Sequence, residues 1–127
     1  MPAVERSIEI QASPATVWSF FATQEGLRAW WGAEIEIDMT VGGKHRHYVP
    51  EVNQWISGYV LEIVPAKQLI LSWFEEDCDW VFPTRLVFTL EAIPGGTRVT
   101  HRYDGFAGIG KHTWERTMQA YDRGIDL

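Results

Sequence analysis

Two pairs of side chains in this sequence could perform chemistry, and the members of each pair lie two residues apart on a predicted strand. His45 and His47 form the first pair, and His101 and Tyr103 form the second. Side chains two apart on a strand project to the same face of a sheet, so each pair acts from one face. Neutral imidazoles so placed can chelate zinc or copper. A histidine beside a tyrosine can instead move a proton on a carbonyl compound.

The sequence offers too few ligands for a metal site at these histidines. A zinc site takes three or four protein ligands, and no cysteine or carboxylate joins the histidines at ligand spacing. We therefore expect no stoichiometric metal and no other cofactor. The imidazoles are expected to bond to Tyr103, to the backbone or to water.

An acid–base role would use His101 or His45 together with Tyr103. Two further polar candidates, Glu62 and Arg85, have the strand parity of outward positions. The sequence also lacks a nucleophile elbow, a phosphate-binding glycine loop and a dinucleotide fingerprint. An enzyme acting on a carbonyl substrate is therefore kept as an alternative, and no catalytic residue is assigned.

Aromatic residues are more numerous than one small core requires, with seven tryptophans in 127 residues. Large amphipathic rings suit the lining of an apolar pocket, although a solid, densely packed core is the competing interpretation. We expect Trp73 and Trp114 to flank a cavity. The full set of predicted ligand-binding residues is Trp31, His45, His47, Trp73, Phe88, His101, Tyr103, Trp114 and Met118.

The composition predicts one soluble domain spanning residues 1–127. A formal charge of −6 argues against nucleic acid as a partner. No signal peptide is evident, and no apolar run approaches the ~20 residues of a membrane span, which favours a cytoplasmic location.

The single cysteine, Cys78, lies in an acidic stretch, 75–79, that we expect to be a solvated turn. Its carboxylates should raise the pKa of the thiol and make it less reactive.

Alternation and turn residues predict an antiparallel sheet with few helices. Two short helices are expected after a first strand, with Ser13 and Thr23 as their N-caps and Pro14 at the first helical position. The predicted strands are 4–12, 34–38, 44–49, 55–64, 69–74, 84–92 and 97–103. An amphipathic helix from about Ile109 follows, with an apolar stripe of Trp114, Met118, Tyr121 and Ile125.

Several separated segments, in the right order, resemble one family. They are the helix pair ending in Trp30–Trp31, the glycine turn 41–45, the strand 58–65, Leu71–Ser72–Trp73 and the strand 96–100. Together they are similar to the START-like (SRPBCC) superfamily, and within it to the family of the activator of heat-shock protein 90 ATPase. The resemblance implies an α+β helix-grip fold: a curved antiparallel sheet with two short helices after the first strand and a C-terminal helix packed on its concave face. It also implies that the position of His45 faces a pocket.

The family resemblance implies binding of a hydrophobic or aromatic small molecule between the sheet and the C-terminal helix. Cyclase- or aromatase-type members imply the alternative of an enzyme acting on a carbonyl or polyketide-like substrate. The family name implies a third role, a co-chaperone-like protein-interaction module connected with stress response. Fold is a poor guide among these roles, since one fold hosts many chemistries.

The predicted final helix is short for the family. Gly124–Ile125 resembles a Gly-Trp pair that lies well inside the family's long final helix. The pocket mouth is then either open or covered by a second subunit, unless the helix begins as early as Gly108. An apolar strip left in water favours association, so we expect a homodimer.

Overall fold

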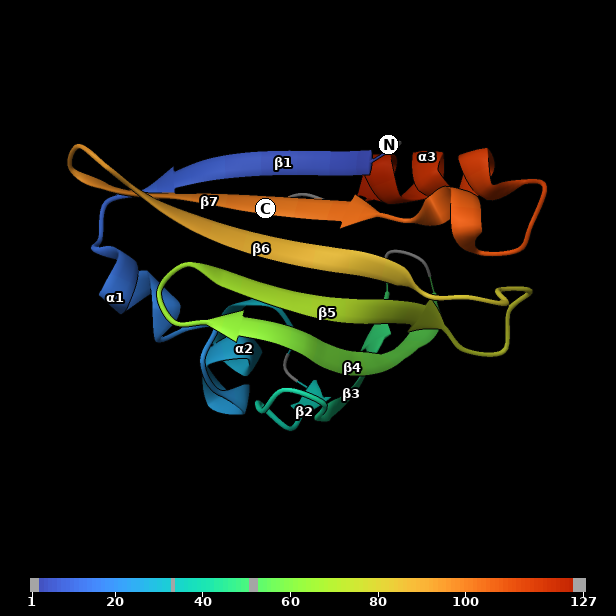
Figure 1. The fold of residues 1–127 in the computed structure, drawn as a ribbon, viewed down its shortest axis with the longest axis horizontal. Coiled ribbons are helices and arrows are strands. Elements are labelled where there is room, and N and C mark those ends of the chain that lie inside the picture. The colour runs from blue at the N-terminus through green and yellow to red at the C-terminus, as the bar shows by residue number, and fades with distance from the viewer. Residues whose placement is uncertain (1–2, 33, 51–52, 125–127) are drawn as a thin grey trace.

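Seven antiparallel strands make one curved sheet in the order β1-β7-β6-β5-β4-β3-β2 (Figure 1). The computed structural model describes residues 3–32, 34–50 and 53–124, and the predicted stripe residue Ile125 lies outside them. The strands are β1 (Ala3–Ile10), β2 (Glu36–Ile37), β3 (Lys44–Val49), β4 (Gln54–Val64), β5 (Gln68–Glu75), β6 (Thr84–Ile93) and β7 (Gly96–Asp104). The helices are α1 (Pro14–Trp18), α2 (Gln24–Trp30), the 3-10 turn η1 (Phe106–Gly108) and α3 (Trp114–Gly124). The predicted α+β helix-grip fold is confirmed.

The two short helices form where the capping residues predict them. The Ser13 side chain accepts a hydrogen bond from the Thr16 amide, and the Thr23 side chain accepts one from the Gly26 amide. Pro14 occupies the first turn of α1, where its missing N–H costs nothing. Between these helices the Phe21 ring packs edge-on against Phe88 of β6, with ring centroids 5.1 Å apart. The helix pair therefore covers one end of the inner sheet face.

Helix α3 covers the opposite end of the same face, beside β1 and η1 (Figure 1). It starts at Trp114, five residues later than the sequence pattern predicts. Gly110 explains the delay, because its φ of +92° lies outside the helical region. The anchor of α3 is Tyr121, which is 2% exposed and lies against Trp73 and Tyr103 of the sheet.

Two strands are shorter than predicted. The first strand ends at Ile10 rather than Ala12, and the second contains only Glu36 and Ile37. Both lie at the sheet edges, where only one neighbour supplies hydrogen bonds. Within the described residues no helix is long and apolar enough to span a membrane.

Candidate functional site

The two predicted pairs of functional side chains all point into the interior. His45, His47, His101 and Tyr103 are each between 2% and 5% exposed. Their ring centroids are 5.8 Å apart in the first pair and 4.8 Å apart in the second. The inward orientation deduced from strand parity is therefore confirmed for both strands.

Trp73 of β5 connects the two pairs. Its ring centroid lies 5.1 Å from that of His47 and 5.1 Å from that of Tyr103, edge-on in both contacts. The indole is 1% exposed, so it forms the centre of the interior rather than a wall open to solvent. We call the interior group Trp31, His47, Trp73, Phe88, His101 and Tyr103 the aromatic cluster.

Trp31 reaches this cluster from the end of α2. Its ring centroid is 4.8 Å from His47, 5.4 Å from Phe88 and 6.0 Å from Trp73. Phe88 in turn stacks on His101 at 4.8 Å. Trp31 is partly exposed and also stacks on the exposed Trp30, whereas His47, Trp73 and Phe88 are buried, so Trp31 lies between these rings and solvent.

The histidines of the cluster are neutral and short of hydrogen bonds. Nε2 of His47 and both ring nitrogens of His101 are buried without a partner in the structure. Burial lowers the pKa of His101 to about 4, and burial together with the neighbouring His45 lowers the pKa of His47 to about 3. A neutral imidazole has one N–H donor and one lone-pair acceptor, so the cluster offers unused polar groups in an apolar setting.

His45 differs from the other two histidines, because its ring forms a hydrogen bond where the pairing of two strands is interrupted. The pairing of β4 with β5 runs through Ser57–Phe74 and resumes at Val60–Leu71. In between, the Tyr59 amide donates to the Ser72 hydroxyl, and His45 Nε2 lies 2.7 Å from the Ser72 carbonyl oxygen. A carbonyl only accepts, so Nε2 carries the proton and Nδ1 keeps a lone pair without a partner.

Gly58 makes this arrangement sterically feasible. A Cβ atom at that position would lie 2.0 Å from the Ser72 carbonyl oxygen and 2.7 Å from His45 Nε2. Glycine at this position in the middle of β4 is thus required by the close approach of the Ser72 carbonyl and the His45 ring.

The predicted residues on α3 lie apart from the histidines. Trp114 and Met118 are partly buried and pack on the edge of the hydrophobic core. The prediction that Trp73 and Trp114 flank a cavity therefore stays a prediction, as does the ligand-binding role of the nine predicted residues.

One buried polar network was missed in the sequence. Tyr121 of α3 donates to Glu75 Oε2 at 2.6 Å and accepts from Trp73 Nε1 at 2.8 Å. Glu75 is 8% exposed at the end of β5, so it does not belong to the solvated acidic turn that its neighbours suggested. Strand parity was the available signal, because Glu75 is two residues beyond Trp73 and shares its inward face.

The pKa of the Cys78 thiol is raised, as the sequence predicts. Burial is the largest cause that raises the pKa of its thiol, and the adjacent Glu75 carboxylate adds to it. Among residues 3–32, 34–50 and 53–124, no three His, Cys, Asp or Glu side chains gather as a metal-binding group.

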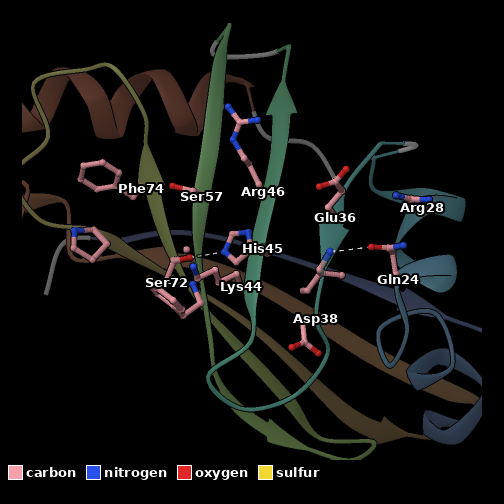
Figure 2. Close-up of a pocket in the computed structure, with 14 residues that line it drawn as sticks. Gln24, Arg28, Glu36, Asp38, Lys44, His45, Arg46, Ser57, Ser72 and Phe74 are labelled. Atoms are coloured by element: carbon pink, nitrogen blue, oxygen red, sulfur yellow. Dashed lines mark hydrogen bonds between the residues drawn. The ribbon is translucent and has the colours of Figure 1, made fainter.

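A cavity of about 820 Å³ lies on the outer face of β3 to β5 and beside the edge strand β2 (Figure 2). Its lining includes exposed side chains opposite in strand parity to His47 and Ile56, together with Gln24 and Arg28 of α2. Of the predicted ligand-binding residues, His45 alone is among those that line it. We call this cavity the outer groove.

A family profile matches the chain over residues 11–121, and its description is "Activator of Hsp90 ATPase homolog 1-like protein". The chain belongs to this family. The START-like resemblance drawn from separated sequence segments is thereby confirmed. Among proteins with curated descriptions, none matches the sequence.

Solved structures share the fold of this activator-homologue family member at low identity. Protein MLL2253 from Mesorhizobium loti is 20% identical with a TM-score of 0.75, over 97% of this chain and 88% of that chain. The Aha1 dimer from Colwellia psychrerythraea is 19% identical with a TM-score of 0.68, over 100% and 98%. CalU16 from Micromonospora echinospora is 16% identical with a TM-score of 0.70, over 96% and 70%. Likeness at these identities extends to the fold alone.

Proposed function

We propose that this protein binds a hydrophobic aromatic small molecule in the aromatic cluster, between the sheet and its covering helices. The observation that carries the proposal is the set of unpartnered nitrogens on His47 and His101 among buried rings. An unsatisfied buried polar group costs about 1–3 kcal/mol. A ligand that supplies the missing hydrogen bonds recovers that energy on binding.

The polar groups define what such a ligand carries. A hydroxyl can donate to a bare ring nitrogen or accept from a protonated one, so a phenolic or enolic hydroxyl complements either kind of unpartnered imidazole nitrogen. The surrounding Trp31, Trp73 and Phe88 rings favour a flat, apolar body.

Trp31 provides the route by which the ligand reaches the cluster. It occupies the space next to His47 and Phe88 and is the partly exposed member of the group. It lies at the C-cap of α2 and is followed by Gly32, whose missing side chain leaves room for the backbone to move. Outward movement of this indole would free an indole-sized volume beside His47.

The test compares 1-naphthol with naphthalene, which has the same rings but no hydroxyl, by titration monitored through protein NMR. We expect 1-naphthol to bind about five- to tenfold more tightly, the effect of one hydrogen bond. His101→Phe should abolish that preference, whereas His112→Phe, at an exposed position outside the cluster, should leave it intact. No saturable binding of either compound, or an unchanged preference in His101→Phe, would refute the proposal.

A catalytic role would use the same site. The His101 and Tyr103 rings are 4.8 Å apart, which places a neutral base beside a phenol, the arrangement needed for proton transfer on a carbonyl ligand. Its test is solvent-deuterium incorporation into a bound 1,3-diketone such as acetylacetone, compared between the wild type and Tyr103→Phe. Equal incorporation rates would rule out this use of the site.

We also propose association into a homodimer. The solved Colwellia relative is described as a dimer. On this chain Val81 and Phe82 are each 62% exposed, in the loop that pairs with Ile109 before α3. Sedimentation equilibrium of the wild type and of a Val81→Ser, Phe82→Ser variant tests the proposal. A wild type that remains at 14.6 kDa at micromolar concentration would exclude it.

A further inference from the structure

The outer groove differs from the aromatic cluster in both chemistry and place. Figure 2 shows its labelled side chains spread across four strands, with Phe74 at one end and Glu36 at the other, and Arg28 beyond Glu36 on α2. Neighbouring strands lie about 4.8 Å apart, so the groove from β2 to β5 extends roughly 14 Å. Its volume of about 820 Å³ is within the usual range for small-molecule sites.

Arg46, at the centre of the groove, is already neutralised by the protein. Its guanidinium makes two hydrogen bonds to the Glu76 carboxylate, at 2.9 and 3.1 Å, and lies 4.1 Å from the centroid of the Trp55 ring. The same contact lowers the pKa of Glu76. Arg46 and Glu76 thus act as a fixed wall rather than as free charges.

The charged side chains at the β2 and β3 end of the groove are not neutralised by ion pairs within the part of the chain that the structure describes. Lys44 and Glu36 form no ion pair with any described residue. The Asp38 carboxylate accepts a hydrogen bond from the Thr40 hydroxyl, at 3.3 Å, and forms no ion pair with a described residue. Arg28 uses Nε on the Ile35 carbonyl and leaves its terminal nitrogens without a described partner. Two free cations and two free carboxylates therefore line one end of the groove.

The opposite end is apolar and firmly held. Phe74 is half-buried and packs edge-on against the buried Trp80, with centroids 6.2 Å apart. Pro83, just before β6, is exposed, and the half-exposed Tyr59 lies on β4 opposite Lys44 of β3. Between the two ends lie Ser57 and the floor formed by His45, which is 2% exposed and keeps an unpartnered Nδ1 lone pair.

We propose that the outer groove is a second ligand site, which binds an amphipathic zwitterion with an aromatic group, such as an aromatic α-amino acid. The ammonium group pairs with Glu36 and Asp38, and the carboxylate pairs with Lys44 and Arg28, as charge-assisted hydrogen bonds. The aromatic ring lies against Phe74 and Tyr59. This site does not depend on the aromatic cluster, and its ligand differs in charge from the apolar one proposed there.

The test uses L-phenylalanine and three analogues, each lacking one feature: 3-phenylpropionate without the ammonium, phenethylamine without the carboxylate, and L-alanine without the ring. Binding is followed by amide NMR shifts. We expect saturable binding of L-phenylalanine with shifts at Lys44, Ser57 and Phe74, and at least about fivefold weaker binding of every analogue. Shifts concentrated at His47 and His101, equal binding of all four compounds, or no saturation by 10 mM (roughly −2.7 kcal/mol) would overturn the proposal.

Matched variants check the roles of the charges. Glu36→Gln should weaken L-phenylalanine about two- to fivefold and leave 3-phenylpropionate unchanged, since that analogue lacks the ammonium. Lys44→Gln should weaken both compounds. The controls are Glu115→Gln and Lys67→Gln, exposed positions outside the groove lining, which should change neither. Equal effects of the groove and control variants would show that only net charge is being measured and would overturn the site.

Discussion

Replacement of Tyr121 by phenylalanine tests whether a buried hydrogen-bond network holds α3 onto the sheet. The phenol connects two other buried side chains, because it donates to Glu75 and accepts from Trp73. Burial, followed by the charge of Glu75, raises the pKa of Tyr121, so the phenol is a protonated donor at neutral pH. Tyr121→Phe preserves the ring and its packing and removes only the oxygen.

The expected cost follows from the groups left behind. The variant leaves a carboxylate oxygen and an indole N–H buried without their partner, and each such group costs about 1–3 kcal/mol. We therefore expect the free energy of unfolding to fall by about 2–4 kcal/mol, measured by urea denaturation followed by circular dichroism. For a chain of this size, that corresponds to a decrease in Tm of roughly 10 °C.

The control for this measurement is Tyr59→Phe, which removes a phenol oxygen from a side chain that is 50% exposed. Its stability should remain within about 0.5 kcal/mol of the wild type. The double variant Glu75→Gln, Tyr121→Phe should lose less than the sum of the single losses, because the two groups belong to one network. A loss below about 0.5 kcal/mol in Tyr121→Phe alone would refute the role of the network.

Three further measurements test other features. Gly58→Ala should destabilise the protein by more than about 3 kcal/mol, because its Cβ would lie 2.0 Å from the Ser72 carbonyl oxygen, whereas Gly108→Ala, with open space around it, should change little. The pKa of His101 falls from 6.5 to about 4 on folding, so the unfolded chain binds a proton more readily than the folded one as the pH falls. The free energy of unfolding should therefore be highest above pH 6.5 and decrease between pH 6.5 and pH 4. In urea titrations His101→Phe should remove up to about 3 kcal/mol of that decrease. Iodoacetamide should alkylate Cys78 more slowly than free glutathione at pH 8, because burial raises the pKa of the thiol; an equal rate would contradict this.

Local sequence rules predicted most of the fold because the chain obeys them at nearly every element. The capping residues Ser13 and Thr23 perform the predicted role, and strand parity placed His47 and His101 inside correctly. The start of α3 was predicted too early because its amphipathic spacing extends back to Ile109. Gly110 adopts a positive φ that periodicity alone does not reveal.

The site was harder to predict because its features arise between strands distant in sequence. Glu75 sits in an acidic run, and strand parity indicates only that it faces inward; its hydrogen bond to Tyr121, 46 residues away, has no signal in the local sequence. The outer groove combines α2 with four strands, and none of its charged residues stands out in the sequence. His45 was grouped with His47 by spacing, yet its Nε2 bonds to Ser72 of β5.

The gap between β4 and β5 connects these observations physically. Near Gly58 the regular hydrogen bonding between β4 and β5 is interrupted. The Tyr59 amide donates instead to the Ser72 hydroxyl, and the His45 ring donates to the Ser72 carbonyl. A ring committed to the sheet in this way has little freedom to rotate toward the aromatic cluster. His45 therefore lies between two regions: the unpartnered nitrogens of His47 and His101 belong to the aromatic cluster, while His45 is also part of the lining of the outer groove. On β3 and β5, His47 and Trp73 belong to the aromatic cluster, whereas Arg46 and Phe74 line the outer groove, so the two faces of these strands differ in chemistry.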